Sequence, residues 1–496
     1  MAGIVGTLSK IQGLRRGARG SLAGGLAVMA LALGGCKEDE PTSDAGETGG
    51  ETGSATSTSG ADESSGGSTG AAIDPNAPTW YQDIAPMVIT KCGGCHREDG
   101  IAPFSLTDYE SAAPYAVALA ASVEERTMPP FAAADTEECE MNVGWKDDLR
   151  ISAEETQALR AWADAFAPEG DPETAAPVGE PAPVELTTVD TTLEMDASVA
   201  IGGPHDEFLC FSLDPQLTED RYLQALQIVP GNEKIVHHVL IYVDLEGGSA
   251  ELAGPDGSFP CDGGSLEGEL VGAWAPGAMP ARTPEGSGMR VPAGARLVMN
   301  VHYHPTGGED EIDDSTAIQI DWLDERPAWV AQLALVGNGD GLLPGPNDDS
   351  GVEFRIPAGV SGHTETHLVE IPPEYPELRL WGIGAHMHYV GVDMLIGVQR
   401  ENSPGPAEEC LLHAPTYSFE WQRLYTYDTT LDDALRVAGG DMLYLRCTYD
   451  NTMNNEGVVE ALGQQGLDEP IEVFLGEETL DEMCLGVFGI AAPNFF

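Results

Sequence analysis

The sequence predicts a multidomain protein in which a small all-α domain precedes two all-β antiparallel sandwich domains of the jelly-roll-like type. The chain has 496 residues, too many for one ordinary domain, and 42% of them are hydrophobic, which is enough for several cores. Its 60 glycines and 35 prolines suit a turn-rich, β-rich protein better than a helical one. Helical spacing of apolar residues occurs near the N-terminus, and short β-branched runs follow it.

Residues 1–35 are expected to be a signal peptide, because basic residues and no acid accompany an apolar run over residues 22–33 that is too short to span a bilayer. The run leads into the sequence LGGC, which resembles a bacterial lipobox in which Cys36 carries the lipid. An ordinary signal peptide followed by a chance cysteine is the alternative. We expect an exported lipoprotein, periplasmic or on the cell surface, anchored to the outer membrane of a Gram-negative bacterium.

Residues 36–77 are expected to form a lipid-anchored flexible tether, because Ser, Thr, Gly, Asp and Glu fill most of this segment. Over the whole chain, 82 acidic residues outnumber 23 basic ones, which gives a formal net charge of −59. Such a surface repels the phosphate backbone, so we expect no nucleic-acid partner.

A small helical domain is expected over residues 78–170. Ser152 and Glu155 form a capping-box signal at the start of one helix. Another helix is indicated by the apolar spacing of Ala112, Tyr115, Ala116, Leu119 and Ala120. Residues 171–188, rich in Pro, Ala, Glu and Gly, are expected to be a flexible linker.

The helical domain contains a C-x-x-C-H motif, formed by Cys92, Cys95 and His96. In such motifs two thiols form thioethers with haem c, and the histidine supplies an axial nitrogen. The alternatives are a disulfide within the motif or a zinc site, for which the domain offers only Cys139 as a further thiolate. The motif therefore predicts one covalently bound haem c.

The same domain resembles cytochromes c in two further positions. Met128, before two prolines, stands where these proteins carry the distal axial ligand, and Met141 is its competitor. Pro103 resembles the proline whose carbonyl holds the proximal histidine. We therefore expect a cytochrome c-like domain over residues 78–170.

From residue 189 onward the sequence predicts strands separated by Gly, Pro and Asp turns. Some 300 residues of this pattern suit two sandwiches better than one, so we expect domains at 189–340 and 341–496, with the boundary in a Gly/Pro-rich stretch. The clearest strand-like runs cover residues 234–244, 295–303, 317–322, 329–336, 378–387, 392–398, 442–448, 471–475 and 485–490.

Six of the eleven histidines fall in three tight clusters of this β region: His237-His238, His302-Tyr303-His304 and His386-Met387-His388. Side chains two residues apart on a strand share a face, so each H-x-H pair can chelate one ion. The adjacent pair can share an ion only if its strand ends or bulges there. Imidazole ligands suit copper, zinc, iron or nickel.

The ordered set of HHVLIYVD, VHYHP, HMH and DEMC resembles the copper type II, ascorbate-dependent monooxygenases, over about residues 190–490. The resemblance implies two copper ions. It implies that His237, His238 and His302 bind the first and that His386, His388 and Met483 bind the second. A thioether ligand favours Cu(I) over zinc. Strand geometry leaves His304 open as a ligand, and Met453 remains a second candidate thioether.

The resemblance also implies an enzyme that hydroxylates a C–H bond with dioxygen, with His386, His388 and Met483 at the reacting metal. Two one-electron equivalents are needed, from an ascorbate-like reductant or a redox protein. We expect the fused haem to reduce the first copper across the linker. The alternative is a non-catalytic electron-transfer or copper-binding lipoprotein. Gly384 stands where the peptide-amidating members of the family carry an Arg, and Val487 stands where these and the catecholamine-forming members carry a Tyr, so the small organic substrate is unassigned.

In an exported protein, six further cysteines suggest disulfides. The resemblance implies the pairs Cys210–Cys261 and Cys447–Cys484. It leaves Cys139 and Cys410 without an assigned partner. Surface or structural roles are expected for the remaining histidines, His205, His363, His367 and His413.

Overall fold

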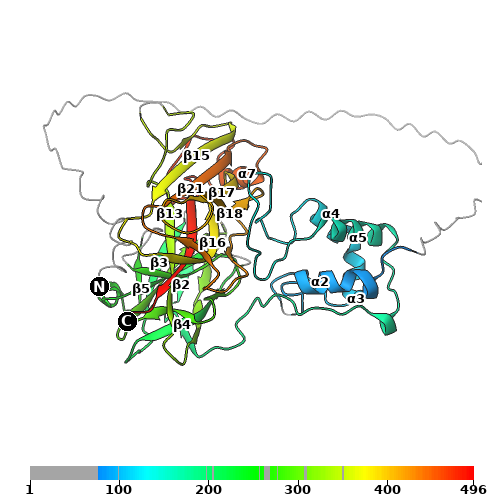
Figure 1. Ribbon diagram of the computed structural model, residues 1–496, viewed down its shortest axis with the longest axis horizontal. Helices are drawn as coiled ribbons and strands as arrows, with labels where there is room; N and C mark the ends of the chain where they lie inside the picture. Colours follow the sequence, from blue (N-terminus) through cyan, green and yellow to red (C-terminus); the bar gives the residue numbers. More distant parts are fainter. Residues whose placement is uncertain are drawn as a thin grey trace, which may run out of the picture. The chain divides into compact units, whose positions relative to one another are not determined.

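The computed structural model describes residues 76–98, 100–196, 198–203, 206–255, 257–261, 268–275, 278–306, 310–348 and 351–495. The expected signal peptide, Cys36, nearly all of the tether and His205 lie outside the described residues. The described chain is mostly β-sheet, and most of its few helices come from the part nearest the N-terminus (Figure 1). In this part of the chain, no helix is long and apolar enough to cross a membrane.

Short helices pack around one core in the first described segment. Ser152 and Glu155 cap α5 as predicted, since each side chain accepts a hydrogen bond from the other residue's backbone N–H. The rings of Trp80 and Trp162, both buried in this core, lie 5.7 Å apart. The helices are η1 (Trp80–Ile84), α2 (Ala85–Cys92), α3 (Tyr109–Ala112), η2 (Ala113–Tyr115), α4 (Ala116–Glu124) and α5 (Ala153–Asp164).

Residues 171–188, expected to be a flexible linker, contact the segments on either side of them. It contains the short helix η3 (Pro172–Thr174). The Asp171 carbonyl accepts a hydrogen bond of 2.7 Å from Gln82, in the helical part. Leu186 N donates a 2.7 Å hydrogen bond to Gln227, in the β region. The linker composition predicts no such contacts, because each depends on a partner remote in sequence.

The described β region contains a long ten-stranded sheet, a five-stranded sheet and a four-stranded sheet. The long sheet has the path β1-β12-β4-β9-β13-β23-β16-β19, with β8 and β20 at its side. Its strands are β1 (Thr191–Glu194), β4 (Arg221–Val229), β8 (Ala281–Arg282), β9 (Ser287–Val291), β12 (Ala317–Trp322), β13 (Trp329–Gly337), β16 (Leu378–His386), β19 (Leu424–Thr426), β20 (Leu435–Val437) and β23 (Leu485–Pro493).

The two smaller sheets supply the remaining large layers. The five-stranded order is β6-β3-β10-β5-β7, and the four-stranded order is β15-β21-β17-β18. Their bounds are β3 (Glu207–Leu213), β5 (Val236–Asp244), β6 (Ser258–Pro260), β7 (Glu269–Trp274), β10 (Arg296–Tyr303), β15 (Ser361–Glu370), β17 (Gly391–Gln399), β18 (Glu408–Ala414) and β21 (Met442–Asp450). Smaller elements are β2 (Val199–Ile201), β11 (Glu311–Asp313), β14 (Arg355–Ile356), β22 (Val473–Phe474), α6 (Ser249–Leu252) and α7 (Glu456–Gln464).

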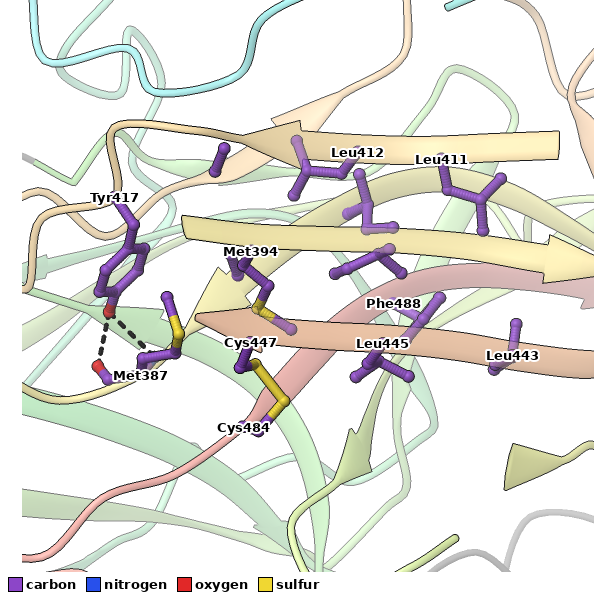
Figure 2. Close-up of a cluster of buried hydrophobic side chains, with 14 of the residues drawn as sticks. Met387, Met394, Leu411, Leu412, Tyr417, Leu443, Leu445, Cys447, Cys484 and Phe488 are labelled. Atoms are coloured by element: carbon purple, nitrogen blue, oxygen red, sulfur yellow. Dashed lines mark hydrogen bonds between the residues drawn. A yellow bond between two sulfur atoms is a disulfide. The ribbon is translucent and has the colours of Figure 1, made fainter. Parts of the chain in front are cut away.

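Each smaller sheet shares a hydrophobic core with the long sheet. Apolar residues of β3, β5 and β10 pack with residues of β4, β9 and β12 in one core. Residues of β17, β18 and β21 pack with residues of β16 and β23 in the other (Figure 2). This layering is compatible with two β-sandwiches. Strand β13 pairs with β23 along its whole length, so the long sheet continues past the boundary expected near residue 340.

Candidate metal centres

The first histidine group lies on two neighbouring strands of the five-stranded sheet. His302 on β10 pairs with His238 on β5, but the next residue, Tyr303, pairs with Val236. His237 is therefore the extra residue of a β-bulge. The bulge supplies the irregularity that two adjacent histidines need in order to share one ion.

Ring nitrogens of these three histidines converge. His302 Nδ1 lies 3.4 Å from His237 Nδ1 and 3.2 Å from His238 Nδ1. One nitrogen from each ring lies within 4.8 Å of the others, a spacing that could hold one metal ion. Burial lowers the pKa of His237 to about 3 and that of His238 well below its usual value. Both imidazoles are therefore neutral at physiological pH, which is the form that binds metals.

A carboxylate lies behind the first group. Asp206 Oδ2 is 3.0 Å from His302 Nε2, and Asp206 Oδ1 is 2.7 Å from His304 Nδ1. Thr479 also donates a 2.6 Å hydrogen bond to this carboxylate. Burial opposes ionisation, but the histidine hydrogen bonds hold the pKa of Asp206 well below its usual range. His304 thus pairs with a carboxylate and lies outside the group of three converging histidines. Strand geometry alone had allowed His304 as a metal ligand.

The second group begins at the end of β16. Met387 lies in the hydrophobic core, where the Tyr417 hydroxyl bonds to both its backbone N–H (3.0 Å) and its carbonyl (2.5 Å) (Figure 2). His386 and His388 flank this core residue, and their ring centroids are 5.3 Å apart. Alternation along the chain therefore gives the two histidines a shared face opposite Met387.

Both rings of the second pair are oriented through Nδ1. Gln422 Oε1 lies 2.5 Å from His386 Nδ1, while the Gln422 amide nitrogen donates to the Phe419 carbonyl. The Asp481 carbonyl lies 3.0 Å from His388 Nδ1. These acceptors place a proton on each Nδ1 and leave each Nε2 as the ligand atom. Burial lowers the pKa of His388 to about 3 and also lowers that of His386.

A buried carboxyl group joins the His388 backbone to the predicted thioether ligand. Glu482 Oε2 accepts hydrogen bonds from His388 N (2.5 Å) and from Met483 N (2.7 Å). Burial raises the pKa of Glu482 to about 8. Met483 is itself buried, and its neighbour Cys484 forms a disulfide with Cys447 on β21. The structure thus holds Met483 close in the fold to the histidine pair, although 95 residues of sequence separate Met483 from His388.

The two groups are neighbours in the fold. The Phe419 ring lies 5.1 Å from the His237 ring and 5.7 Å from the His388 ring. After burial and His386, the first group also contributes to the lowered pKa of His388. Sequence reasoning missed Phe419, because no motif marks this residue.

The C-x-x-C-H motif lies at the end of α2. Cys92 and Cys95 are free thiols, and burial raises the pKa of Cys92 to about 12. His96 Nδ1 is 3.2 Å from the Phe104 carbonyl, so the carbonyl of Phe104, and not that of Pro103 as expected, holds the ring. This contact leaves His96 Nε2 as the nitrogen available to a metal.

The two candidate axial methionines lie in different surroundings. Met128 is half-buried and follows α4, whereas Met141 packs against the core shared by the four-stranded sheet. Met453, the second candidate thioether for copper, is 48% exposed. Its exposure contrasts with the burial of Met483.

The other cysteines and described histidines have structural partners. Both disulfides implied by the resemblance, Cys210–Cys261 and Cys447–Cys484, are present. A third joins Cys139 to Cys410, which were left unassigned. The histidines expected to be structural are buried and hydrogen-bonded: His363 to Glu365, His367 to the Asp340 carbonyl and His413 to Asp393.

Comparison with known proteins finds two animal hydroxylases similar to part of the chain. The chain is 26% identical over 251 residues to dopamine beta-hydroxylase from Canis lupus familiaris, which covers 48% of this chain and 37% of that protein. It is 22% identical over 270 residues to tyramine beta-hydroxylase from Caenorhabditis briggsae, with coverages of 52% and 40%. The chain thus spans well under half the length of these relatives.

No family model matches the chain. The major capsid protein P2 from bacteriophage PM2 is similar over 61% of this chain and 97% of its own, at 8% identity and a TM-score of 0.23. A TM-score this low carries no argument about fold or function.

Proposed function

We propose that the chain is a copper-dependent monooxygenase that hydroxylates a C–H bond of an organic substrate with dioxygen. The observation that carries this proposal is the pair of neighbouring histidine groups on either side of Phe419, in which burial lowers the pKa of four of the five imidazoles. Neutral imidazoles suit copper. The similarity to two hydroxylases supports the same chemistry at a coarse level.

Different donor sets suit the two groups to different tasks. His237, His238 and His302 offer three nitrogens, and Asp206 fixes the His302 ring from behind. His386 and His388 offer two nitrogens, and Met483 would add a thioether, which favours the reduced ion. When bound, the two coppers would supply one-electron redox chemistry and dioxygen activation. The buried surroundings of both groups would exclude water from the reacting metal.

We further propose that Cys92, Cys95 and His96 hold a haem c that supplies electrons. Two features support this: the motif thiols are free while the six other described cysteines form disulfides, and His96 presents Nε2. An exported lipoprotein anchored through Cys36 would meet the oxidising conditions that suit these disulfides. An ascorbate-like reductant or a redox protein would reduce the haem.

The deciding experiment measures metal, haem and oxygen chemistry on the same preparation. Residues 37–496, expressed with haem-maturation machinery, should contain one haem c and two coppers per chain. Met483→Ala should lose one copper and keep the haem. The reduced protein should consume oxygen faster when an organic substrate is added, and should transfer labelled oxygen to it.

Each outcome separates the alternatives. Haem without copper would overturn the monooxygenase. Two coppers with oxygen consumption independent of every organic compound in a broad substrate panel would favour an electron-transfer or copper-binding protein.

A further inference from the structure

We propose that the segment Gln422–Arg423 connects the haem motif to the second metal group, so that electrons enter the site at His386. This inference rests on the proposed function and names the route that its electrons take. It differs from the sequence-based expectation that the haem reduces the first copper.

One end of the segment is fixed to the strand that carries His386. Gln422 accepts the hydrogen bond from His386 Nδ1 at 2.5 Å. Leu424 pairs with Gly384 in the β16–β19 ladder. A Cβ atom at Gly384 would lie only 3.0 Å from the Arg423 carbonyl, so glycine permits this close approach. The backbone of the segment is therefore held directly against the ligand strand.

The other end, Arg423, lies near two parts of the helical segment. The Arg423 guanidinium lies 5.3 Å from the centre of the Phe131 ring, and Phe131 is three residues after Met128, the predicted distal ligand. The Arg423 charge also reaches Cys95, where it opposes the rise in thiol pKa that burial causes. Arg423 therefore contacts the segment that follows Met128 and acts electrostatically on a thiol of the haem motif.

Arg423 also has an unused donor. Its Nη2 contacts the thioether of Met279, but its buried Nη1 has no hydrogen-bond partner among the described residues. A buried guanidinium N–H without an acceptor is costly. A carboxylate is the acceptor that guanidinium prefers, and haem carries two propionate carboxylates. We assign Nη1 to one of these propionates.

Residues that follow Phe131 in the sequence attach the helical segment that carries the haem motif to the second sandwich. The Cys139–Cys410 disulfide joins it covalently to β18. Lys146 N donates a 2.8 Å hydrogen bond to the Thr426 carbonyl on β19. The Trp145 and Tyr427 rings stack with centroids 5.0 Å apart. The segment that follows Phe131 is therefore held on the strands that flank Arg423 and His386.

The haem motif also contacts the first half of the β region, but at a strand that does not carry the first histidine group. Arg97 pairs with Glu185 at 2.6 Å, and the Glu185 carbonyl accepts a 2.8 Å hydrogen bond from Arg282 on β8. Strand β8 pairs with β4 in the long sheet. The first histidine group lies on the five-stranded sheet, so this contact does not run to its ligands.

The transfer itself is a single electron. The ferrous haem iron becomes ferric, and copper(II) at the second group becomes copper(I). No atom or proton is exchanged between them. The reductant that serves the enzyme then returns the haem to its ferrous state.

Anaerobic single-electron reduction tests the route on the full loaded protein. The haem is reduced by a short pulse, and its visible absorbance is followed while electron paramagnetic resonance reports copper(II). Rapid haem reoxidation should persist in His237→Ala and be lost in His388→Ala. The reverse pattern would overturn the route.

Metal and haem counts on each sample keep the two proposals distinguishable. Wild-type protein without haem or copper would contradict the proposed function and with it the route. Fully loaded protein that hydroxylates substrate, but whose haem is reoxidised only when the first group is intact, would contradict the route alone.

A charge variant tests Arg423 through the haem potential, which does not depend on turnover. Arg423→Gln should lower the haem midpoint potential, because the lost positive charge stabilised the reduced haem. A unit charge that acts across a partly buried gap changes the equilibrium constant for haem reduction about tenfold. For a one-electron couple this corresponds to a shift of about 59 mV in the midpoint potential.

The matched controls are Arg423→Lys, which keeps the charge, and Arg436→Gln, which removes an arginine that pairs with Glu377 elsewhere in the same domain. Both should keep the wild-type potential. If Arg423→Gln and Arg436→Gln gave the same potential and the same rate of haem reoxidation, the assignment of Arg423 would be wrong.

Discussion

The two histidine groups are assembled in different ways. The first comes from adjacent strands of one sheet, where direct pairing of His238 with His302 and one bulge bring the rings together. The second combines the end of β16 with the loop before β23, where Met483 is held by Glu482 and by the Cys447–Cys484 disulfide. Sheet pairing and one bulge thus bring the first group together, with Asp206 beside His302, whereas the second group depends on a covalent link and a buried carboxyl group.

Removing the disulfide beside Met483 should have the largest effect. It closes a loop of 37 residues, and we expect Cys447→Ser with Cys484→Ser to lower the free energy of unfolding by about 4 kcal/mol. Because the loop that carries Met483 is released, copper bound at the second group should be lost first. Denaturant unfolding and copper titration measure the two effects.

The control is the double variant Cys210→Ser and Cys261→Ser, which opens a loop of 51 residues. It should lower the free energy of unfolding by a similar amount, about 4 kcal/mol. It should leave copper at the second group. Equal copper loss in both double variants would mean that general destabilisation, and not the position of the disulfide, controls the second group.

Substitution of Glu482 should disturb the same loop less than removal of the disulfide does. Glu482→Ala leaves the buried His388 and Met483 N–H groups without their acceptor, and copper affinity at the second group should fall by about 10–100-fold. Glu482→Gln keeps a neutral oxygen acceptor and should retain most of the affinity, since a pKa of about 8 leaves the native carboxyl largely protonated at neutral pH. Competition against a copper chelator measures both variants.

The raised pKa of Glu482 also predicts a pH dependence of stability. Below its usual value of 4.5, native and unfolded chains both hold the proton. Between 4.5 and about 8 the unfolded chain loses it while the native protein keeps it, so stability falls as pH rises. Metal-free protein should therefore unfold more readily at about pH 8 than at about pH 5, and Glu482→Gln should remove part of that slope. A wild-type slope unchanged in Glu482→Gln would contradict the assigned pKa.

A smaller loss of copper affinity is expected when the carboxylate beside the first group is replaced. Asp206→Asn keeps the shape of the side chain but removes the charge behind His302, so copper affinity at the first group should fall by about tenfold. The second group should be unaffected. Copper titration of Asp206→Asn in a Met483→Ala background isolates the first group, and an unchanged affinity there would show that sheet pairing alone orients His302.

The smallest effect is expected at Met453. Because this thioether is 48% exposed, Met453→Leu should keep both coppers and change stability by less than about 0.5 kcal/mol. Loss of one copper in this variant, measured beside Met483→Ala, would reverse the assignment of the thioether ligand.

Local sequence was informative where one strand or one helix turn decides the geometry. The H-x-H spacing placed His386 and His388 on one face, and the Ser152 capping box marked the start of α5. The adjacent pair His237-His238 required a bulge or a strand end, and a bulge is present. Each of these expectations depends only on backbone geometry over a few residues.

Tertiary structure decided everything that joins distant segments. Asp206, Phe419 and Gln422 reach the histidines from loops with no recognisable motif. The Cys139–Cys410 disulfide spans 271 residues, and its partners could not be chosen from spacing. By itself the sequence therefore determined the ligand types and which neighbouring residues share a face, because those follow from local backbone geometry. The contacts among the two histidine groups and the haem motif depend on strand order and loop packing, which no local pattern contains.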